Sequence, residues 1–187
     1  MEGLGVVMKS AVLVIDIVND FVSGIFGSEN SVAVSGKIAT FLKKLEGKAE
    51  IVFTLDTHIP NDPEFRVWGE HCIMGTWGCQ QVDSLKNILG YRITKRHFDA
   101  FHDTDLDGYL RALGIGTLYV LGISTDICVQ HTVAGAFYRY YELNVISDLC
   151  GAISPDRHLE AISSMKRNYG ARLLTSAEAL EELKHGI

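Results

Sequence analysis

Three residues with reactive side chains, Asp16, Lys95 and Cys128, each follow a short apolar run of the chain. A carboxylate at the end of such a run is costly unless it is paired or used. A thiol needs a base, or a lowered pKa, to act as a nucleophile near neutrality. Together, the carboxylate can take the thiol proton and the ammonium can stabilise developing negative charge. The pattern therefore predicts nucleophilic catalysis by Cys128.

Each of these residues also has a structural interpretation. Cys128 could be a small buried residue in the first turn of a helix, Asp16 could cap a turn, and Lys95 could be a solvated lysine at a strand end. If Cys128 does begin a helix, the helix dipole is expected to stabilise its thiolate. The presence of all three residues at comparable positions favours the catalytic interpretation.

A second group of candidate residues lies in the segment "LDTHIPNDPEFRVWGEHC". Asp56 and His58 are two positions apart on a strand extension, so both side chains point the same way, and His71 returns from the loop. One carboxylate and two imidazoles suit zinc first, with Fe²⁺ or Mn²⁺ as alternatives, and Glu64 is a possible fourth ligand. The alternative is a pair of unrelated loop histidines. None of the other histidines has metal-like spacing: His97, His102, His131, His158 and His185. Of these, His158 and His185 are expected to be solvated helix residues.

Short β-rich apolar runs alternate with amphipathic stretches along the chain. The strand candidates are 11–16, 50–56, 91–95, 117–123, 143–148 and 171–175. The helix candidates are about 31–46, 104–113, 127–141, 156–168 and 176–184. This alternation predicts an α/β fold, with a doubly wound, six-stranded parallel sheet covered by helices on both faces. The expected strand order is 3-2-1-4-5-6.

This fold places the candidate residues at one edge. Ligands of an open parallel sheet bind beyond the carboxyl ends of the strands. Asp16, Asp56, Lys95 and the segment leading to Cys128 all lie at those ends. The long polar segment 57–90 follows the second strand, and a loop of that length in a compact domain is usually functional.

Bulk composition narrows the class of protein. The 187 residues suit one domain, 1–187, in which residues 1–9 are expected to be loose and Met8 is an alternative start. A net charge of −6 argues against nucleic acid or an anionic membrane as partner. No apolar run is long enough to span a membrane, and the N-terminus is unlike a secretory signal. Four cysteines without a CxxC pair indicate reduced thiols and a cytoplasmic protein.

Four segments in this order resemble the nicotinamidase/isochorismatase-like cysteine hydrolases, over about residues 11 to 175. They are "VIDIVNDF", "LDTHIPNDPEFRVWGEHCIMGTWG", "ITKRHFDAF" and "GISTDICVQHT". The resemblance implies an Asp16–Lys95–Cys128 triad and an oxyanion hole formed by the backbone N–H groups of Ser124 and Cys128. It also implies a cis peptide bond between Ile123 and Ser124.

The same resemblance implies a metal site and a substrate pocket. The metal ligands of the nicotinamidases correspond to Asp56, His58 and His71, with Glu64 where those enzymes often have a histidine. The substrate-binding residues correspond to Phe21, Trp68, Phe98, Ile123 and Ser124, although aromatic residues also suit an ordinary core, above all Phe101. The family commonly forms dimers or tetramers, and the apolar segment 133–141 could supply an interface or simply pack on the sheet.

The activity implied is release of ammonia from a small carboxamide, with nicotinamide as the leading substrate. Many nicotinamidases have Tyr-Ser-Gly-Phe after the lysine, whereas this chain has Phe98-Asp99-Ala100-Phe101. Asp99 is therefore expected to add an acid near the pocket mouth. True isochorismatases lack the nucleophilic cysteine, so Cys128 argues against their activity. The alternatives are an N-carbamoylsarcosine amidase-like hydrolase, a non-catalytic binding protein for a small ligand, and a redox or zinc-storage protein that uses the cysteines.

Overall fold

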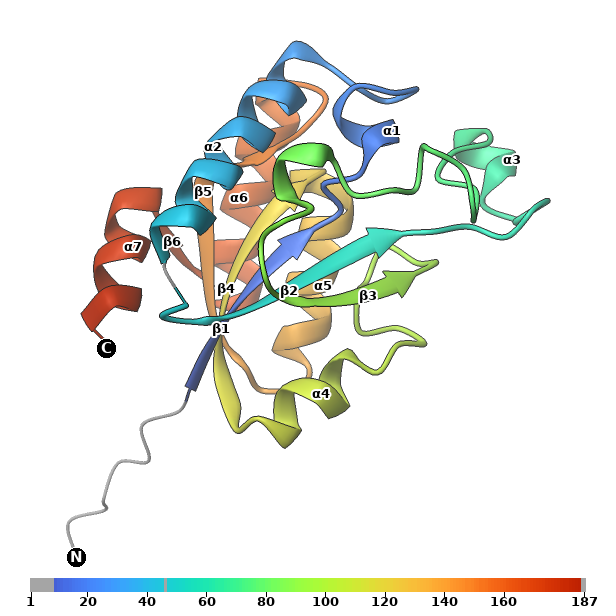
Figure 1. Ribbon diagram of the computed structural model, residues 1–187. Helices are drawn as coiled ribbons and strands as arrows, with labels where there is room; N and C mark the ends of the chain where they lie inside the picture. The colour runs from blue at the N-terminus through green and yellow to red at the C-terminus, as the bar shows by residue number, and fades with distance from the viewer. Residues whose placement is uncertain (1–8, 46, 186–187) are drawn as a thin grey trace, which may run out of the picture.

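Six parallel strands form the sheet at the centre of the computed structural model, which describes residues 9–45 and 47–185 (Figure 1). The strand order is β3-β2-β1-β4-β5-β6, as predicted from the alternation of strands and helices. The strands are β1 Lys9–Ile15, β2 Glu50–Asp56, β3 Tyr91–Lys95, β4 Ile115–Ile123, β5 Glu142–Gly151 and β6 Arg172–Leu174.

Helices cover both faces of this sheet (Figure 1). α2 and α7 pack together on one face, while α5 and α6 pack together on the other, and α4 contacts β4. The helices are α1 Asn19–Val22, α2 Glu29–Leu45, α3 Phe65–Trp68, α4 Leu106–Ala112, α5 Gln130–Phe137, α6 Pro155–Tyr169 and α7 Ser176–His185. The predicted three-layer α/β architecture is confirmed.

Local signals at the helix ends explain most of the boundaries. Ser154 Oγ accepts a hydrogen bond from Arg157 N at 3.3 Å, which caps α6. Thr175 and Glu178 form a reciprocal pair that begins α7, since Glu178 Oε2 accepts from Thr175 N and Thr175 Oγ1 accepts from Glu178 N. Gly170 ends α6 in the left-handed conformation, with φ 66°.

The predicted helix 127–141 differs most from the observed one. It begins with a π-helical turn, Thr125–Val129, and continues as α5 only to Phe137. The expected loop 57–90 is largely irregular, with the short helix α3 and a 3₁₀ turn at Asp83–Leu85. Residues 1–8 of the segment expected to be loose lie outside the described residues, whereas Lys9 is the first residue of β1.

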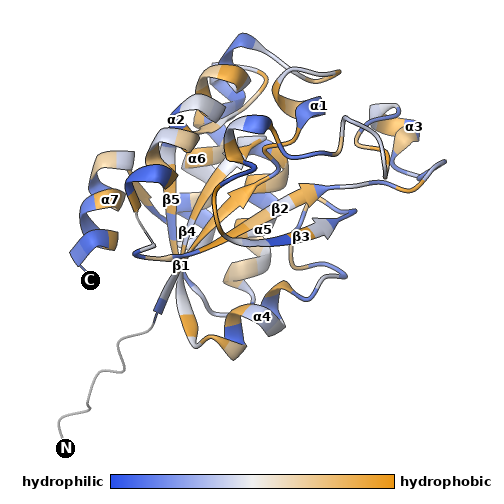
Figure 2. Cartoon of the chain, in the orientation of Figure 1, coloured by the Kyte–Doolittle hydropathy of each residue, from blue (hydrophilic) through white to orange (hydrophobic). Residues whose placement is uncertain are grey.

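The centre of the sheet is the apolar core. Residues 11–15 of β1 are completely buried, because β1 lies between β2 and β4 and both of its faces are covered by helices. Figure 2 shows the hydrophobic colour concentrated on the central strands. No helix in the described part of the chain is both long and apolar enough to cross a membrane.

The residues after β1 anchor the long loop that follows β2. Asp20 Oδ2 accepts a hydrogen bond from Cys72 N at 2.7 Å, and Asn19 Nδ2 donates to the Trp77 carbonyl at 2.8 Å. Asp20 N also donates to the Gly78 carbonyl at 3.0 Å. α1 therefore fixes the loop against the carboxyl edge of the sheet, where the candidate site lies.

We expect Gly122→Ala to destabilise the fold by at least about 2 kcal/mol, because of overpacking and backbone strain. Gly122 has φ 138°, and a Cβ at this position would collide with the backbone of Ile15 in β1. The free energy of unfolding should be measured by urea denaturation. Gly108→Ala is the control, since nothing lies within 4 Å of a Cβ there and the change within α4 should be neutral or stabilising. Equal stability of the two variants would contradict this account.

Candidate active site

The Lys95 ammonium lies at the centre of a buried cluster at the carboxyl edge of the sheet. Lys95 Nζ lies 2.6 Å from Asp16 Oδ2, 3.1 Å from Asp56 Oδ1 and 3.6 Å from Cys128 Sγ. It also donates to the His97 carbonyl at 3.0 Å. Lys95 is only 2% exposed, so its interpretation as a solvated strand-end lysine is wrong. The structure therefore brings the three residues of the expected triad together.

Asp16 is oriented by the neighbouring strand β2. Thr54 Oγ1 donates to Asp16 Oδ1 at 2.6 Å, and Asp16 N lies 3.2 Å from both the carbonyl and the hydroxyl oxygen of Thr54. Asp16 has φ 51°, so the chain turns immediately after β1. Burial raises the pKa of Asp16 above its ordinary value, although Lys95 and Thr54 lower it. This carboxylate is therefore more basic than an exposed one.

The environment of Cys128 differs from the expectation based on the helix dipole. Cys128 lies within the π-helical turn, and burial raises the pKa of its thiol well above the ordinary value. Lys95 lowers this pKa, but the carboxylates of Asp16 and Asp56 raise it further. The expected stabilisation of the thiolate by the helix N-terminus is thus outweighed by burial. Cys128 therefore needs a base, and the Asp16 carboxylate lies against the same Lys95 ammonium that contacts the Cys128 sulfur.

The turn that carries Cys128 is held by α6. Thr125 Oγ1 and His158 Nδ1 are hydrogen-bonded at 3.0 Å, and Arg157 pairs with Asp126 at 2.6 Å. His158 is therefore not the solvated helix residue expected from the sequence. These contacts were missed because they join segments about thirty residues apart without any local pattern. The peptide bond between Ile123 and Ser124 is cis, as the family resemblance implies.

A second cluster, of potential metal ligands, shares Asp56 with the first. Asp56, His58 and His71 are buried, and one ligand atom from each lies within 4.8 Å of the others. Asp56 Oδ2 is 3.0 Å from His58 Nε2 and 3.6 Å from His71 Nε2. Glu64 Oε1 lies 3.9 Å from both Nε2 atoms, so Glu64 borders this cluster.

The orientation of the two imidazoles fits a divalent metal. His71 Nδ1 lies 2.9 Å from the Gly69 carbonyl, which it can contact only as a donor. His58 Nδ1 lies 3.2 Å from Asp62 Oδ2. Both rings therefore turn Nε2 toward Asp56 and engage Nδ1 elsewhere, as metal-binding histidines usually do. The cluster of described ligands contains no sulfur, which argues against metal storage on the cysteines.

Asp56 connects the two clusters electrostatically. Its Oδ1 accepts from Lys95, while its Oδ2 faces the two histidines. Although burial favours the neutral acid, Lys95 and His58 lower the pKa of Asp56 to about 2. Asp56 is therefore ionised at neutral pH, as a metal ligand must be.

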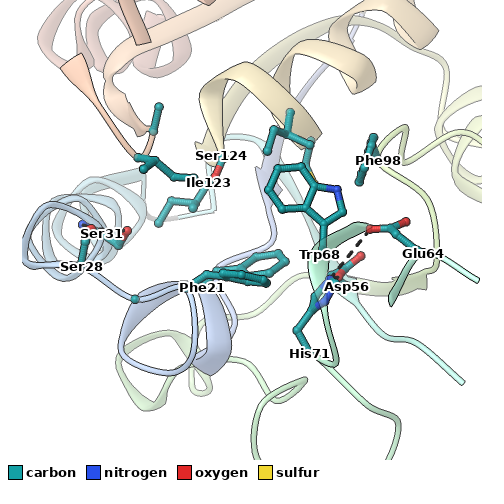
Figure 3. Close-up of a pocket in the computed structure, with 16 residues that line it drawn as sticks. Phe21, Ser28, Ser31, Asp56, Glu64, Trp68, His71, Phe98, Ile123 and Ser124 are labelled. Carbon is teal, nitrogen blue, oxygen red and sulfur yellow. Dashed lines mark hydrogen bonds and ion pairs between the residues drawn. The ribbon is translucent and has the colours of Figure 1, made fainter. Parts of the chain in front are cut away.

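The clusters open into a cavity of about 140 Å³. A cavity of this order can hold a molecule of about the size of benzene. Figure 3 shows Asp56, Glu64 and His71 at one end, and Ser28 and Ser31 at the opposite end. All five residues expected to bind substrate line it: Phe21, Trp68, Phe98, Ile123 and Ser124. Sequence reasoning missed a further set of lining residues. They come from the turn before α2, the first turn of α2, the π-helical turn and the segment after β5: Phe26, Gly27, Ser28, Ser31, Ile127, Ala152 and Ile153.

Three expectations about the segment after β3 have different outcomes. Asp99 does not line the cavity, because its carboxylate lies against Gly135 of α5 and accepts from Phe101 N at 2.9 Å. Phe101 is 4% exposed and belongs to the core. His97 and His102 do meet a carboxylate, Asp103, with metal-like spacing, although the sequence pattern did not indicate it.

Comparison with known proteins gives the family that this chain resembles over most of its length. A family model described as the isochorismatase domain matches residues 10–178. The structure of N-carbamoylsarcosine amidase from Thermoplasma acidophilum is 34% identical, with a TM-score of 0.83, and the match covers 90% of this chain and 97% of that chain.

Two further solved structures are similar over the same extent. Nicotinamidase/pyrazinamidase from Bacillus subtilis is 29% identical with a TM-score of 0.81, over 89% of this chain and 100% of that chain. The pyrazinamidase of Pyrococcus horikoshii, solved in complex with zinc, is 27% identical with a TM-score of 0.82, over 89% of this chain and 99% of that chain.

Replacement of a residue in the metal cluster provides a test. We expect His71→Ala to lower the affinity for zinc by more than about a hundredfold. Loss of a residue that only hydrogen-bonds a metal ligand lowers the affinity by about ten- to a hundredfold, and loss of a ligand itself should cost more. Metal content should be measured by elemental analysis after dialysis that removes weakly held ions. His185→Ala, an exposed histidine of α7, should retain the metal content of the unmodified protein. Unchanged metal content in His71→Ala would exclude His71 as a ligand.

Proposed function

This chain belongs to the isochorismatase family, and on that premise we propose that it is a cysteine amidohydrolase that releases ammonia from a small carboxamide. The leading reaction is hydrolysis of nicotinamide to nicotinate. The observation that carries this proposal is the contact of one buried ammonium, Lys95, with Asp16, Asp56 and Cys128. A protein that only bound a small ligand would have no need to bury these four groups together.

The first half of the reaction begins with the thiol. Asp16 removes the proton from Cys128, and the sulfur attacks the carboxamide carbon, so that a C–S bond forms and the carbonyl electron pair moves onto oxygen. The backbone N–H groups of Ser124 and Cys128 stabilise that oxyanion. Collapse of the intermediate breaks the C–N bond, and the proton held by Asp16 passes to the leaving nitrogen. Ammonia departs and a thioester remains on Cys128.

The second half regenerates the enzyme. Asp16, again unprotonated, takes a proton from water as the water oxygen attacks the thioester carbon. The C–S bond then breaks, the carboxylic acid product leaves, and the sulfur recovers its proton from Asp16. Lys95 remains protonated throughout, because the negative charges around it raise its pKa well above the ordinary value despite burial. Lys95 therefore stabilises whichever partner carries negative charge.

Asp56, His58, His71 and Glu64 are the residues that would hold a divalent metal, with zinc the first choice. When bound, the ion supplies an electrophilic centre that can orient a ring nitrogen of the substrate or a water molecule. Phe21, Trp68 and Phe98 supply the flat apolar walls that a ring-shaped substrate requires.

A second candidate is hydrolysis of a carbamoyl amide, favoured by the 34% identity to N-carbamoylsarcosine amidase. The charge of the cavity favours nicotinamide instead. No described lysine or arginine lines the cavity, and its carboxylates are Asp56 and Glu64. A substrate with its own carboxylate would find no lysine or arginine side chain among the described lining residues to pair with. The third possibility, a non-catalytic binding protein, predicts binding without ammonia release.

Cytoplasmic location and assembly into dimers or tetramers stay predictions from the sequence. Within the segment 133–141, Val133, Ala136 and Tyr141 are buried in the core. Tyr138 and Tyr140 are exposed, at 72% and 91%.

Cys128→Ala should lower the rate of ammonia release from nicotinamide by at least about a thousandfold, as loss of a catalytic nucleophile does. Ammonia release should be measured across nicotinamide, pyrazinamide and N-carbamoylsarcosine. Cys79→Ala is the matched control, because Cys79 is a partly exposed thiol outside the cavity and its loss should leave turnover unchanged. Near-normal turnover in Cys128→Ala would refute the proposed nucleophile.

The pH dependence of kcat/KM should show the raised pKa of Asp16. Because Asp16 must be unprotonated to accept the thiol proton, activity should fall as the pH decreases through that pKa. The midpoint of this acid limb should lie above 3.8, the ordinary value for aspartate. Thr54→Val removes a hydrogen bond that lowers the pKa of Asp16, so it should move the midpoint to higher pH. A midpoint at or below 3.8, or a shift in the opposite direction, would contradict Asp16 as the base.

A further inference from the structure

A second group of potential metal ligands lies on the segment that follows Lys95, outside the cavity. His97, His102 and Asp103 each offer one ligand atom, and these atoms lie within 4.8 Å of one another. None of the three lines the cavity, and none belongs to the cluster around Asp56. The proposed hydrolytic reaction gives these side chains no task.

The distances are close to those of a metal site. His97 Nε2 and His102 Nε2 lie 3.8 and 3.7 Å from Asp103 Oδ2, and the two imidazole rings are nearly perpendicular with centroids 4.5 Å apart. Two ligands on one tetrahedral zinc ion, at bond lengths of about 2.0–2.2 Å, lie roughly 3.3–3.5 Å apart. A shift of a few tenths of an ångström in the side chains would therefore bring the Asp103 oxygen into range of each nitrogen, and the two nitrogens already lie within 4.8 Å of each other.

The backbone of this segment is already fixed. Lys95 holds the His97 carbonyl, and His102 N donates to the Asp99 carbonyl at 3.1 Å. Thr104 Oγ1 donates to the Ala100 carbonyl at 2.6 Å, and Ala100 N donates to Thr132 Oγ1 of α5 at 3.1 Å. Because the turn is ordered before any ion binds, binding requires the ordering of side chains alone, which reduces its entropic cost.

The side chains themselves are available to an ion. His97, His102 and Asp103 are 41%, 60% and 80% exposed, and no described residue forms a hydrogen bond with any of the three side chains within normal distance. An ion bound here would keep its remaining positions for water. Two imidazoles and one carboxylate select Zn²⁺, Ni²⁺ or Cu²⁺ over Mg²⁺ and Ca²⁺, which prefer oxygen ligands.

From this geometry we propose that His97, His102 and Asp103 form an accessory binding site for a divalent transition metal, separate from the cluster around Asp56. The site lies on the segment that also contributes Phe98 to the cavity wall. An ion bound there would connect the start of this segment, at His97, to its end at Asp103. This proposal depends on the ligand geometry and does not require the hydrolytic function to be correct.

The test is the number of zinc ions bound per chain, measured by equilibrium dialysis of protein first freed of metal. The unmodified protein should bind one ion more than His102→Gln and one more than Asp103→Asn. His185→Gln is the matched control. His185 is 62% exposed and lies 3.1 Å from Glu181, so it forms a similar histidine–carboxylate pair without a second imidazole. Its zinc stoichiometry should equal that of the unmodified protein.

A second comparison separates this site from the one around Asp56. In a His71→Ala background, which removes a ligand of the first site, the accessory ion should remain, and addition of His102→Gln should remove it. The rate of Cys128 alkylation by iodoacetamide should be the same in His102→Gln and in the unmodified protein, which shows that the active site is intact. Equal zinc stoichiometry in the unmodified protein, His102→Gln and Asp103→Asn would overturn the proposal.

Discussion

The candidate active site depends on the ion pair between Lys95 and Asp16, whose side chains are both completely buried. Both side chains are buried, and an isolated charge at such a position would carry a large desolvation cost. The cost is reduced because each charge has several partners: Asp56, Cys128 and the His97 carbonyl for Lys95, and Thr54 for Asp16. Removal of one partner would leave the others uncompensated, so the cluster acts as a unit.

Under the proposed function, this arrangement explains how a cysteine with a raised pKa can act as a nucleophile. Many reactive cysteines are exposed near positive charge and exist partly as thiolates. Here burial and two carboxylates keep Cys128 protonated at rest, while burial also makes Asp16 a stronger base. Proton transfer between the two can then accompany attack on the substrate, and Lys95 compensates the negative charge before and after the transfer.

The fold supplies these groups from separate strands. Asp16, Asp56 and Lys95 follow or end β1, β2 and β3, which are neighbours in the sheet, and Cys128 follows β4 on the other side of β1. Asp56 belongs to both clusters because its two oxygens face opposite directions, one toward Lys95 and one toward the histidines. A single carboxylate therefore fixes the position of the potential metal ligands relative to Lys95, Asp16 and Cys128.

The sequence by itself determined the sheet, its strand order and the residues at its carboxyl edge, because apolar periodicity and strand–helix alternation are local properties of the chain. It also indicated Asp56, His58 and His71 through their spacing, with Glu64 as a possible fourth ligand, and the resemblance to a family added residues of the cavity wall. Only the tertiary structure decided that the pKa of Cys128 is raised and that the Asp99 side chain lies away from the cavity. It also decided that His158 supports the π-helical turn. It also brought His97 and His102 to Asp103. These features depend on burial and on the direction of side chains across turns, which are set by packing between distant segments and leave no periodic pattern in the sequence.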